Sequence, residues 1–463
     1  MARQLFNGLI GTSRSALVSS AAFPCEPMMH EPEPEKTASV PTRSPAVVPN
    51  APPRADGGSE RVHDFAAKLQ QPSLWDSVVD YVAWSRALRA AAADGRERPP
   101  IPDRAPPSIN LDLTTACNYA CDHCIDWDIL NSKVRHADDD LRASLREMAA
   151  RGLKSVILIG GGEPTLYPGF VSFVVFLKEL GLHVAVVSNG SKNEKILEIA
   201  PHLGPQDWVR LSLDAGSNET FRRMHKPSRA SLTLDEICSY VPKIKAANPR
   251  FAMGFSYVIT WRGGTRDDVH VVENIHEMVD AAQRARDAGF DYISYKPFLE
   301  RSGEGAEVLD PRKAEQALDV VRARMRALLD EARRLERPGF RVLASTNLRV
   351  LLSGEWTETS AQPRTCHMQF LRQVLTPNGL YNCPAHRGVE KARIADKDAY
   401  ADAERTRRTQ AATADILARF DASHECREVT CLYHSTNWWL ERMIESGDIP
   451  AKAPGTEGED WFL

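Results

Sequence analysis

The sequence predicts an α/β fold in which helices cover a parallel sheet. Between residues 108 and 297, apolar runs typical of buried strands alternate with segments of helical periodicity. Polar residues and glycines follow several of these runs. Strands joined by crossover helices run parallel, with right-handed connections. We expect a partial (βα)6 barrel. An open doubly wound sheet also fits, and in both folds the functional groups belong at the carboxyl ends of the strands.

Six strands and five helices are expected in this region. The strands are Ile109–Leu113, Ser155–Ile159, His183–Ser188, Trp208–Asp214, Met253–Thr260 and Tyr292–Lys296. The helices are Asp140–Arg151, Gly169–Leu180, Lys192–Ala200, Leu234–Ala247 and Val269–Ala288.

The remaining segments differ from the barrel in composition. Residues 1–58 are rich in Pro, Ala, Glu, Ser and Thr and are expected to be disordered, since they cannot bury enough apolar area. Residues 59–107 predict a helical extension, with Ser73 as a helix N-cap, and a proline-rich linker. The barrel is expected over 108–300, and a helical connector that includes a helix from Asp310 to Arg337 over 301–365. Regularity breaks down after Phe340, and 366–463 predict a small cysteine-bearing domain that contains a hairpin at Gln373–Tyr381.

Composition excludes some classes of function. The 58 basic and 62 acidic residues give a net charge of −4, which does not suggest a nucleic-acid partner. No apolar run approaches the roughly 18 residues of a membrane span, and the first residues do not resemble a signal peptide. Most of the nine cysteines cluster at metal-binding spacings, which favours a reducing compartment, by default the cytoplasm. Cys25 is expected to be idle and Cys238 a small buried apolar residue.

Three cysteines, Cys117, Cys121 and Cys124, directly follow the first predicted strand with the spacing C-x3-C-x2-C. Closed zinc and iron–sulfur sites usually take four protein ligands. Three thiolates on one loop can hold a cubane cluster that leaves one iron open to a small molecule. A zinc loop is the alternative interpretation.

Two further motifs accompany this loop. Gly160-Gly161-Gly162-Glu163 ends the second strand, and glycines let a backbone approach a ligand closely. In the fourth strand, alternation points Arg210, Ser212 and Asp214 to one face, and these polar groups are costly to bury without partners. The third strand ends in a polar run that begins at Ser188.

Together these motifs resemble the radical S-adenosylmethionine (SAM) superfamily over about residues 108–297. One departure is His123, where the family's C-x3-C-x-Φ-C motif usually has an aromatic residue. The resemblance implies a TIM-like partial barrel and a [4Fe–4S] cluster on the three cysteines. It further implies that Gly161, Gly162 and Glu163, together with Ser188, Ser212 and Asp214, bind SAM. Reductive cleavage of SAM would then give a 5′-deoxyadenosyl radical, with electrons from a flavodoxin- or ferredoxin-type donor.

Four later cysteines, Cys366, Cys383, Cys426 and Cys431, resemble the C-terminal twitch or SPASM extensions of this superfamily, which carry auxiliary clusters. The spacing departs from the usual pattern, because the gap from Gly379 to Cys383 is three residues and the last pair is separated by four. We expect one auxiliary [4Fe–4S] cluster, with zinc or no metal as alternatives. His424 or His434 is an alternative ligand.

The substrate is predicted to be a small polar molecule. Tyr292 and Lys296 share the inward face of the sixth strand, and with Arg210 they are the candidate catalytic residues. Residues 59–98 lack the strand pairs of a peptide-recognition domain. The resemblance implies dehydrogenation, dehydration or epimerisation of a sugar or aminoglycoside intermediate in antibiotic biosynthesis. A peptide- or protein-modifying maturase is the alternative, and a non-catalytic iron–sulfur sensor is a third hypothesis.

Overall fold

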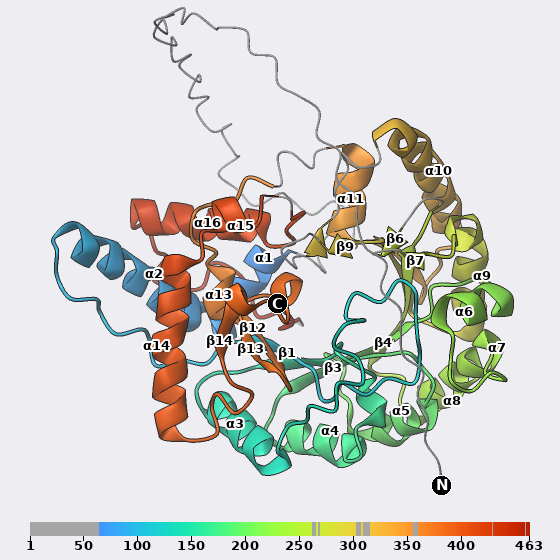
Figure 1. Ribbon diagram of the computed structural model, residues 1–463, viewed down its shortest axis with the longest axis horizontal. Coiled ribbons are helices and arrows are strands. Elements are labelled where there is room, and N and C mark those ends of the chain that lie inside the picture. Colours follow the sequence, from blue (N-terminus) through green and yellow to red (C-terminus); the bar gives the residue numbers. More distant parts are fainter. Residues whose placement is uncertain are drawn as a thin grey trace, which may run out of the picture. The chain divides into compact units, whose positions relative to one another are not determined.

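The computed structural model describes residues 64–261, 265–266, 269–301, 307–308, 315–354, 360–427, 429–458 and 460–463. The segment 1–58, with Cys25, lies outside these residues, as does the start of the helix expected from Asp310. Figure 1 labels the helices and strands by the names that are used below.

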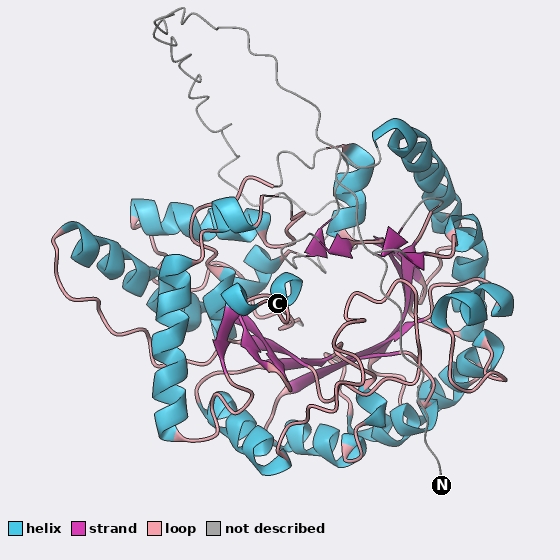
Figure 2. Ribbon diagram, viewed as in Figure 1, coloured by secondary structure: helices cyan, strands magenta, loops and turns pink. Residues whose placement is uncertain are grey.

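A ten-stranded sheet forms the centre of the fold, in the order β11-β8-β5-β4-β3-β2-β1-β12-β13-β14. The strands from β11 to β12 run parallel, and β13 and β14 are antiparallel additions. The sheet is curved, and helices line its convex side (Figure 2). The α/β prediction is therefore confirmed. The strands are β1 Ser108–Leu111, β2 Ser155–Leu158, β3 His183–Ser188, β4 Trp208–Ser212, β5 Ala252–Ile259, β8 Tyr292–Pro297, β11 Arg341–Ala344, β12 Arg372–Thr376, β13 Gly379–Tyr381 and β14 Arg393–Ala395.

Two parallel strands extend the sheet beyond the six that the sequence predicts. β11 pairs with β8 on one side, and β12 pairs with β1 on the other, Leu111 facing Leu375. The expectation of irregular structure after Phe340 is wrong for β11, which is a strand of only four residues. The predicted hairpin is present as β12 and β13, but it continues the main sheet. Among the described residues, two short strand pairs lie outside it: β6 Thr265–Arg266 with β7 Val269–His270, and β9 Glu300–Arg301 with β10 Glu307–Val308.

The helices agree with the prediction except at three places. The expected helix Leu234–Ala247 is two helices with a break at Ser239, and Val269 lies in a strand. The polar helix α6, which begins at the Ser217 N-cap, was not predicted. The bounds are α3 Asp138–Ala150, α4 Phe170–Glu179, α5 Asn193–Ile199, α6 Asn218–His225, α7 Leu234–Cys238, α8 Tyr240–Ala247, α9 Met278–Ala288, α10 Glu315–Arg333 and α11 Thr346–Ser353.

The N-terminal extension packs on the C-terminal helices. It is broken into α1 (Phe65–Leu69) and α2 (Pro72–Ala93), and Gln71 rather than Ser73 is the N-cap, because Pro72 fits the first helical turn. Arg86 of α2 donates a hydrogen bond of 2.6 Å to the carbonyl of Ile444. The C-terminal helices are α13 Met368–Leu371, α14 Ala403–Arg419, α15 Ala422–Glu425 and α16 His434–Ser446, and short 3-10 turns lie at Pro164–Leu166, Ala200–His202, Ile275–Glu277, Pro384–His386 and Glu390–Ala392.

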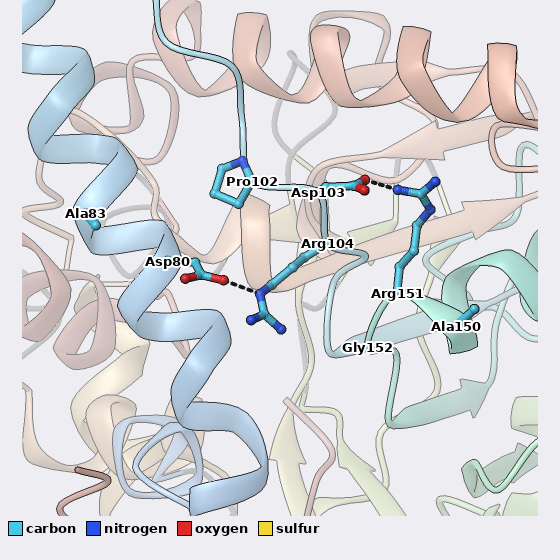
Figure 3. A pocket seen from close by; sticks show the side chains of 8 residues that line it. All are labelled: Asp80, Ala83, Pro102, Asp103, Arg104, Ala150, Arg151 and Gly152. Carbon is cyan, nitrogen blue, oxygen red and sulfur yellow. Dashed lines mark hydrogen bonds and ion pairs between the residues drawn. The ribbon is translucent and has the colours of Figure 1, made fainter. Parts of the chain in front are cut away.

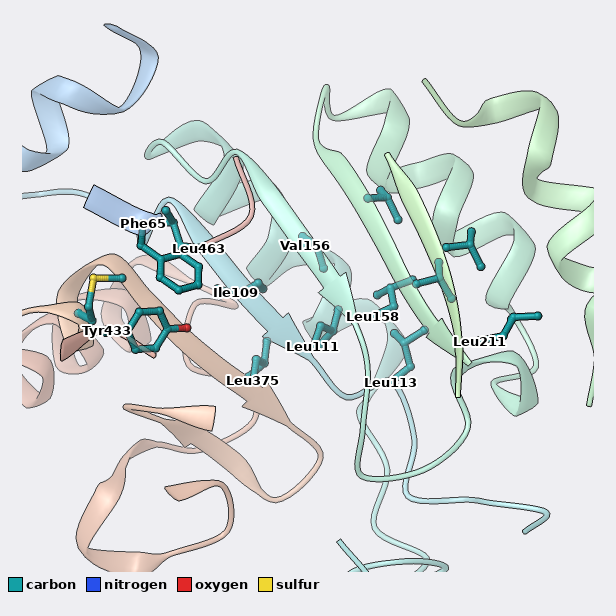
Figure 4. Close-up of a cluster of buried hydrophobic side chains, with 14 of the residues drawn as sticks. Phe65, Ile109, Leu111, Leu113, Val156, Leu158, Leu211, Leu375, Tyr433 and Leu463 are labelled. Carbon is teal, nitrogen blue, oxygen red and sulfur yellow. The ribbon is translucent and has the colours of Figure 1, made fainter. Parts of the chain in front are cut away.

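The core lies between the sheet and the outer helices (Figure 4). Along β4, Val209, Leu211 and Leu213 are fully buried, whereas Arg210 and Ser212 between them are partly exposed on the other face. Each fully buried aliphatic side chain contributes roughly 1.5–3 kcal/mol. The alternation along β4 therefore sets its polar face toward the inside of the curved sheet.

The segment 460–463 covers the amino ends of the first strands. The carbonyl of Trp461 accepts a hydrogen bond of 2.7 Å from Ser155, and the Trp461 ring stacks on His183 at 4.1 Å. Phe462 packs against Trp208 and clusters with side chains on the inner face of the sheet. This end of the sheet is therefore closed by apolar side chains, and polar groups gather at the opposite end. Within the described residues, no helix has the length and apolarity that crossing a bilayer requires.

Candidate functional site

The three predicted cluster cysteines lie on the loop between β1 and α3, at the carboxyl end of β1. None of the three forms a disulfide. Burial raises the pKa of Cys121 well above its usual range, and the neighbouring Cys124 and Cys117 raise it further. The sulfurs are thus close enough to repel one another as thiolates. A bound metal supplies the missing positive charge and deprotonates such thiols. This donor set fits an iron–sulfur cluster.

A hydrogen-bonded group of His123, Asp214 and His225 adjoins the loop. Asp214 follows β4 with a positive φ of 49°. Its carboxylate accepts hydrogen bonds from the Val258 amide at 2.6 Å and from His123 Nε2 at 3.1 Å. Burial raises the pKa of Asp214, but His123 and the other hydrogen bonds outweigh burial and hold the pKa below its usual value.

His225, the last residue of α6, was missed by sequence reasoning. Its Nε2 lies 2.9 Å from the Leu213 carbonyl and its Nδ1 lies 3.2 Å from Cys121 Sγ. Burial lowers the pKa of His225 to about 4. The candidate ligand atoms of His123, Asp214 and His225 lie within 4.8 Å of one another. Because Nε2 of His225 donates to a carbonyl, we interpret the three residues as a hydrogen-bond network. No local sequence pattern in α6 indicates that His225 belongs to this network.

The glycine loop after β2 packs against the cysteine loop. Gly160 and Gly161 have positive φ angles of 43° and 67°, and a side chain at Gly161 would meet the Asp112 carboxylate at 2.7 Å. The Gly161 amide donates to Asp126 at 3.2 Å, and the Glu163 amide donates to a carbonyl of the cysteine loop. Only glycine fits this conformation and this space.

Glu163 and Ser188 connect the glycine loop to β3. The buried Glu163 carboxylate accepts hydrogen bonds from Ser188 Oγ at 2.8 Å and the Asn189 amide at 2.7 Å, and from the amide and hydroxyl of Thr165. Burial raises the pKa of Glu163, although these bonds oppose it. The side chains of Glu163 and Ser188 therefore hold the loop in place.

The inner face of the sheet presents polar side chains in levels, because paired residues on neighbouring strands share a face. Arg210 pairs with Gly254, which pairs with Tyr292. The next level toward the carboxyl ends holds Ser212, Ser256 and Ser294. Lys296 lies one level higher, opposite Val258. Strand pairing thus brings the three candidate catalytic residues, Arg210, Tyr292 and Lys296, to one interior surface.

The four C-terminal cysteines converge, although they come from distant segments. Burial raises the pKa of Cys426 well above its usual range, and Cys366, Cys431 and Cys383 raise it further. Among the described residues, no three thiol sulfurs lie within 4.8 Å of one another, whereas sulfurs on one tetrahedral zinc lie about 3.8 Å apart for bonds of about 2.3 Å.

The imidazoles of the two alternative ligands make other contacts, although the His434 amide donates a hydrogen bond to the Cys431 carbonyl at 3.2 Å. The side chain of His424 is 63% exposed and lies near Glu425. Nε2 of His434 donates to the Ala361 carbonyl at 3.1 Å. Cys238 is 6% exposed in the core, as the sequence predicts.

Arg387 joins the C-terminal cysteine segment to the glycine loop. It follows Cys383 by four residues and is 6% exposed. Its Nε lies 3.1 Å from Asp112 and its Nη1 lies 2.9 Å from Asp126. Burial raises the pKa of Asp112 to about 7, although Arg387 opposes that rise. Sequence reasoning missed this cluster, since its members are more than 250 residues apart.

A surface depression of about 680 Å³ lies at the other end of the sheet (Figure 3). It is lined by segments that precede β1 and β2. Its charges are paired, Arg104 with Asp80 at 2.5 Å and Arg151 with Asp103. The depression is therefore remote from the cysteine loop, and we assign it no chemistry.

Comparison with known proteins agrees with this geometry. The sequence profile of the Radical SAM superfamily matches residues 111–296. The S-adenosylmethionine-dependent nucleotide dehydratase of Thermoplasmatales archaeon (strain ISO4-H5) is 34% identical over 111 residues, 23% of this chain and 38% of that protein. The protein of the same name from Selenomonas ruminantium is 27% identical over 165 residues, 33% of this chain and 56% of that one. The chain thus spans about half the length, or less, of these relatives.

Among solved structures, Streptococcus suis SuiB bound to S-adenosylmethionine is 17% identical, with a TM-score of 0.47 over 65% of this chain and 66% of that one. The matched residues 111–296 contain both the three-cysteine loop after β1 and the glycine loop after β2. The part of the chain that matches the Radical SAM superfamily is therefore the part that carries both of these loops.

Proposed function

We propose that this chain is a radical SAM enzyme that abstracts a hydrogen atom from a small hydroxylated molecule and promotes its dehydration. The substrate class that we propose is a sugar or aminoglycoside intermediate. A nucleotide, which is named in the relatives, also carries a hydroxylated ring. The name dehydratase in these relatives favours loss of water over epimerisation.

Cys117, Cys121 and Cys124 would hold a [4Fe–4S] cluster, and the glycine loop would receive the amino group of SAM. When bound, cluster and SAM supply a 5′-deoxyadenosyl radical for hydrogen abstraction, with electrons from a flavodoxin- or ferredoxin-type protein. The side chains of Glu163 and Ser188 support this loop from below through their mutual hydrogen bond. Ser212 and Asp214 are both predicted to bind SAM. The Asp214 carboxylate already accepts hydrogen bonds from His123 and Val258. We therefore assign the contact with SAM on this strand to the Ser212 hydroxyl.

The observation that carries the substrate class is the pair of hydroxyl-bearing residues Ser256 and Ser294, which lie beside Ser212 on the next two strands. Hydroxyls both donate and accept hydrogen bonds, so they suit a ligand that bears several hydroxyls. Lys296, one level above, would donate the proton that leaves with the substrate hydroxyl as water. Tyr292, whose pKa is raised by burial, stays protonated as a hydrogen-bond donor.

Dehydrogenation is a second candidate, and the convergence of the four C-terminal cysteines favours it. We propose that they bind an auxiliary [4Fe–4S] cluster. Such a cluster can accept the electron that a substrate radical releases on oxidation, whereas dehydration without net redox change does not require one.

The test is anaerobic incubation of the reconstituted enzyme with SAM, a reductant and deuterated sugars, aminoglycosides or nucleotides. Transfer of deuterium into 5′-deoxyadenosine identifies the substrate. A product that has lost water supports dehydration, and one that has lost two hydrogens supports dehydrogenation. Cys238→Ala is the matched control and should retain activity, whereas Cys121→Ala should abolish it. Absence of 5′-deoxyadenosine from the wild type with every compound would refute the proposed function.

A further inference from the structure

Arg210 is a cation on the inner face of the sheet without an anionic partner among the described residues. No carboxylate in that part of the chain forms an ion pair with it, and its Nε is buried with no hydrogen-bond partner. Burial is the main cause that lowers the pKa of Arg210, and this pKa remains far above neutrality because an arginine stays charged in proteins. Arg210 is partly exposed, and the part of its charge that is shielded from water is costly unless it is paired.

Two other arginines near this surface have acceptors for part of their guanidinium groups, although the Nε of Arg372, like that of Arg210, has no hydrogen-bond partner. Arg387 binds Asp112 and Asp126. Arg372 donates to Asn110 at 2.6 Å and contacts the Tyr433 hydroxyl. The fold thus provides acceptors for its structural arginines and provides none for Arg210 within the described residues.

The surroundings of Arg210 hold its guanidinium in place. The group lies 5.2 Å from the centre of the Trp208 ring, a cation–π contact. Tyr292 fills the space above Gly254, where a Cβ would lie 2.2 Å from the tyrosine ring. Gly254 separates Arg210 from Tyr292 in the strand order and lets the phenol lean across. A guanidinium held against an aromatic ring loses less entropy when it binds a ligand than a mobile one does.

The Asp214 carboxylate favours the charged form of Arg210 electrostatically but forms no ion pair with it. Asp214 lies four residues further along the chain, and one of its oxygens accepts from the Val258 amide while the other accepts from His123. The two levels above Arg210 lie about 7 and 13 Å higher at about 3.3 Å per residue. A sugar-sized molecule spans that distance.

We propose that Arg210 binds an oxyanion of the substrate, a phosphate or a carboxylate, and thereby orients its hydroxylated part toward the serine level and the cysteine loop. Guanidinium groups match both oxyanions in bidentate geometry. The orientation of the substrate toward the cysteine loop rests on the proposed function, because that function places the reacting carbon there. The binding of an oxyanion by Arg210 does not depend on the proposed function. The proposal accordingly narrows the proposed substrate class to sugar derivatives that carry a phosphate or a carboxylate.

The test is equilibrium dialysis of the reconstituted, SAM-loaded enzyme with glucose 6-phosphate, glucuronate and glucose. We expect the two anionic probes to bind more tightly than glucose. The tighter of the two anionic probes shows whether the site prefers a phosphate or a carboxylate. Arg210→Gln should weaken the better probe roughly 10- to 150-fold, the range that corresponds to a charge-assisted hydrogen bond, and Arg210→Lys should weaken it less. Arg405→Gln, which removes an arginine from a surface ion pair with Asp398, is the control and should bind like the wild type.

A second measurement on the wild type avoids any failure of the variants to fold. Phenylglyoxal modifies arginines, and mass spectrometry of peptides locates the adduct. Inorganic phosphate or glucuronate should protect Arg210 while Arg405 remains reactive. Equal modification of Arg210 with and without both anions, or equal binding of glucose and the anionic probes, would overturn the proposal. Failure of the proposed function would instead appear as absence of 5′-deoxyadenosine, with oxyanion binding intact.

Discussion

Replacement of Arg387 by methionine tests the connection between the C-terminal cysteine segment and the glycine loop. The change removes a guanidinium that is 6% exposed and lies 3.1 Å from Asp112 and 2.9 Å from Asp126. Two buried carboxylates then lose their counter-charge. Removing one partner of a buried pair costs about 3–5 kcal/mol, so we expect a loss of that size in the free energy of unfolding.

The loss should depend on pH in a defined direction. Burial already raises the pKa of Asp112 to about 7 in the fold, against about 3.9 in an unfolded chain. A raised carboxyl pKa means that the folded state holds the proton more tightly, so this stabilisation is present at low pH and is lost as the pH rises through 7. Without Arg387 the pKa rises further. The variant should therefore recover relative to the wild type as the pH falls from 8.5 to 7, by at most about 1.4 kcal/mol per pH unit.

The assay is urea unfolding of the anaerobically reconstituted protein at pH 7 and 8.5, followed by tryptophan fluorescence. Asp112→Asn in the Arg387→Met background should restore part of the stability, since it removes one buried charge. Arg405→Met should leave the unfolding midpoint unchanged. A difference below about 1 kcal/mol at pH 8.5, where the cost of an unpaired buried charge is largest, would refute the reasoning, as would a difference that widens on acidification.

Three further outcomes are expected. Phe462→Ala should lower the free energy of unfolding by about 3–5 kcal/mol, because Phe462 is 4% exposed against Trp208; an unchanged thermal midpoint would contradict the packing of this segment. Gly161→Ala should weaken SAM binding in equilibrium dialysis, because the φ of Gly161 is 67° and the new Cβ would meet the Asp112 carboxylate. The control is Gly181→Ala, which has comparable backbone strain but whose Cβ would meet nothing within 4 Å. Cys426→Ser should halve the iron content while the electron paramagnetic resonance signal of the first cluster persists, and an unchanged iron content would exclude Cys426 as a ligand.

The parallel part of the fold could be predicted because its signals are local. Alternation of buried and polar residues along β4, and glycine after β2, are readable within ten residues, and the predicted strands agree with the structure to within about two residues at their ends. The three-cysteine loop is equally local. Sequence reasoning could therefore place these groups at one edge of the sheet.

The rest depends on contacts between distant segments. Nothing around Arg387 indicates that Asp112 and Asp126 lie beside it, and the polar helix that ends at His225 has no pattern that points to Cys121. β11 is too short to stand out from its surroundings. Partners of this kind are set by tertiary packing, which local periodicity does not encode.

The pairing of β1 with β12 has a consequence for the order in which the chain folds. Leu111 faces Leu375 across two hydrogen-bonded strands, so 264 residues separate the partners. At a synthesis rate of 5–20 residues per second, roughly 13 to 53 s pass between their appearance on the ribosome. Throughout that interval β1, which leads into the three-cysteine loop, lacks its second neighbour and exposes unpaired backbone groups. The cysteine loop is therefore synthesised long before the strand that completes the sheet beside it.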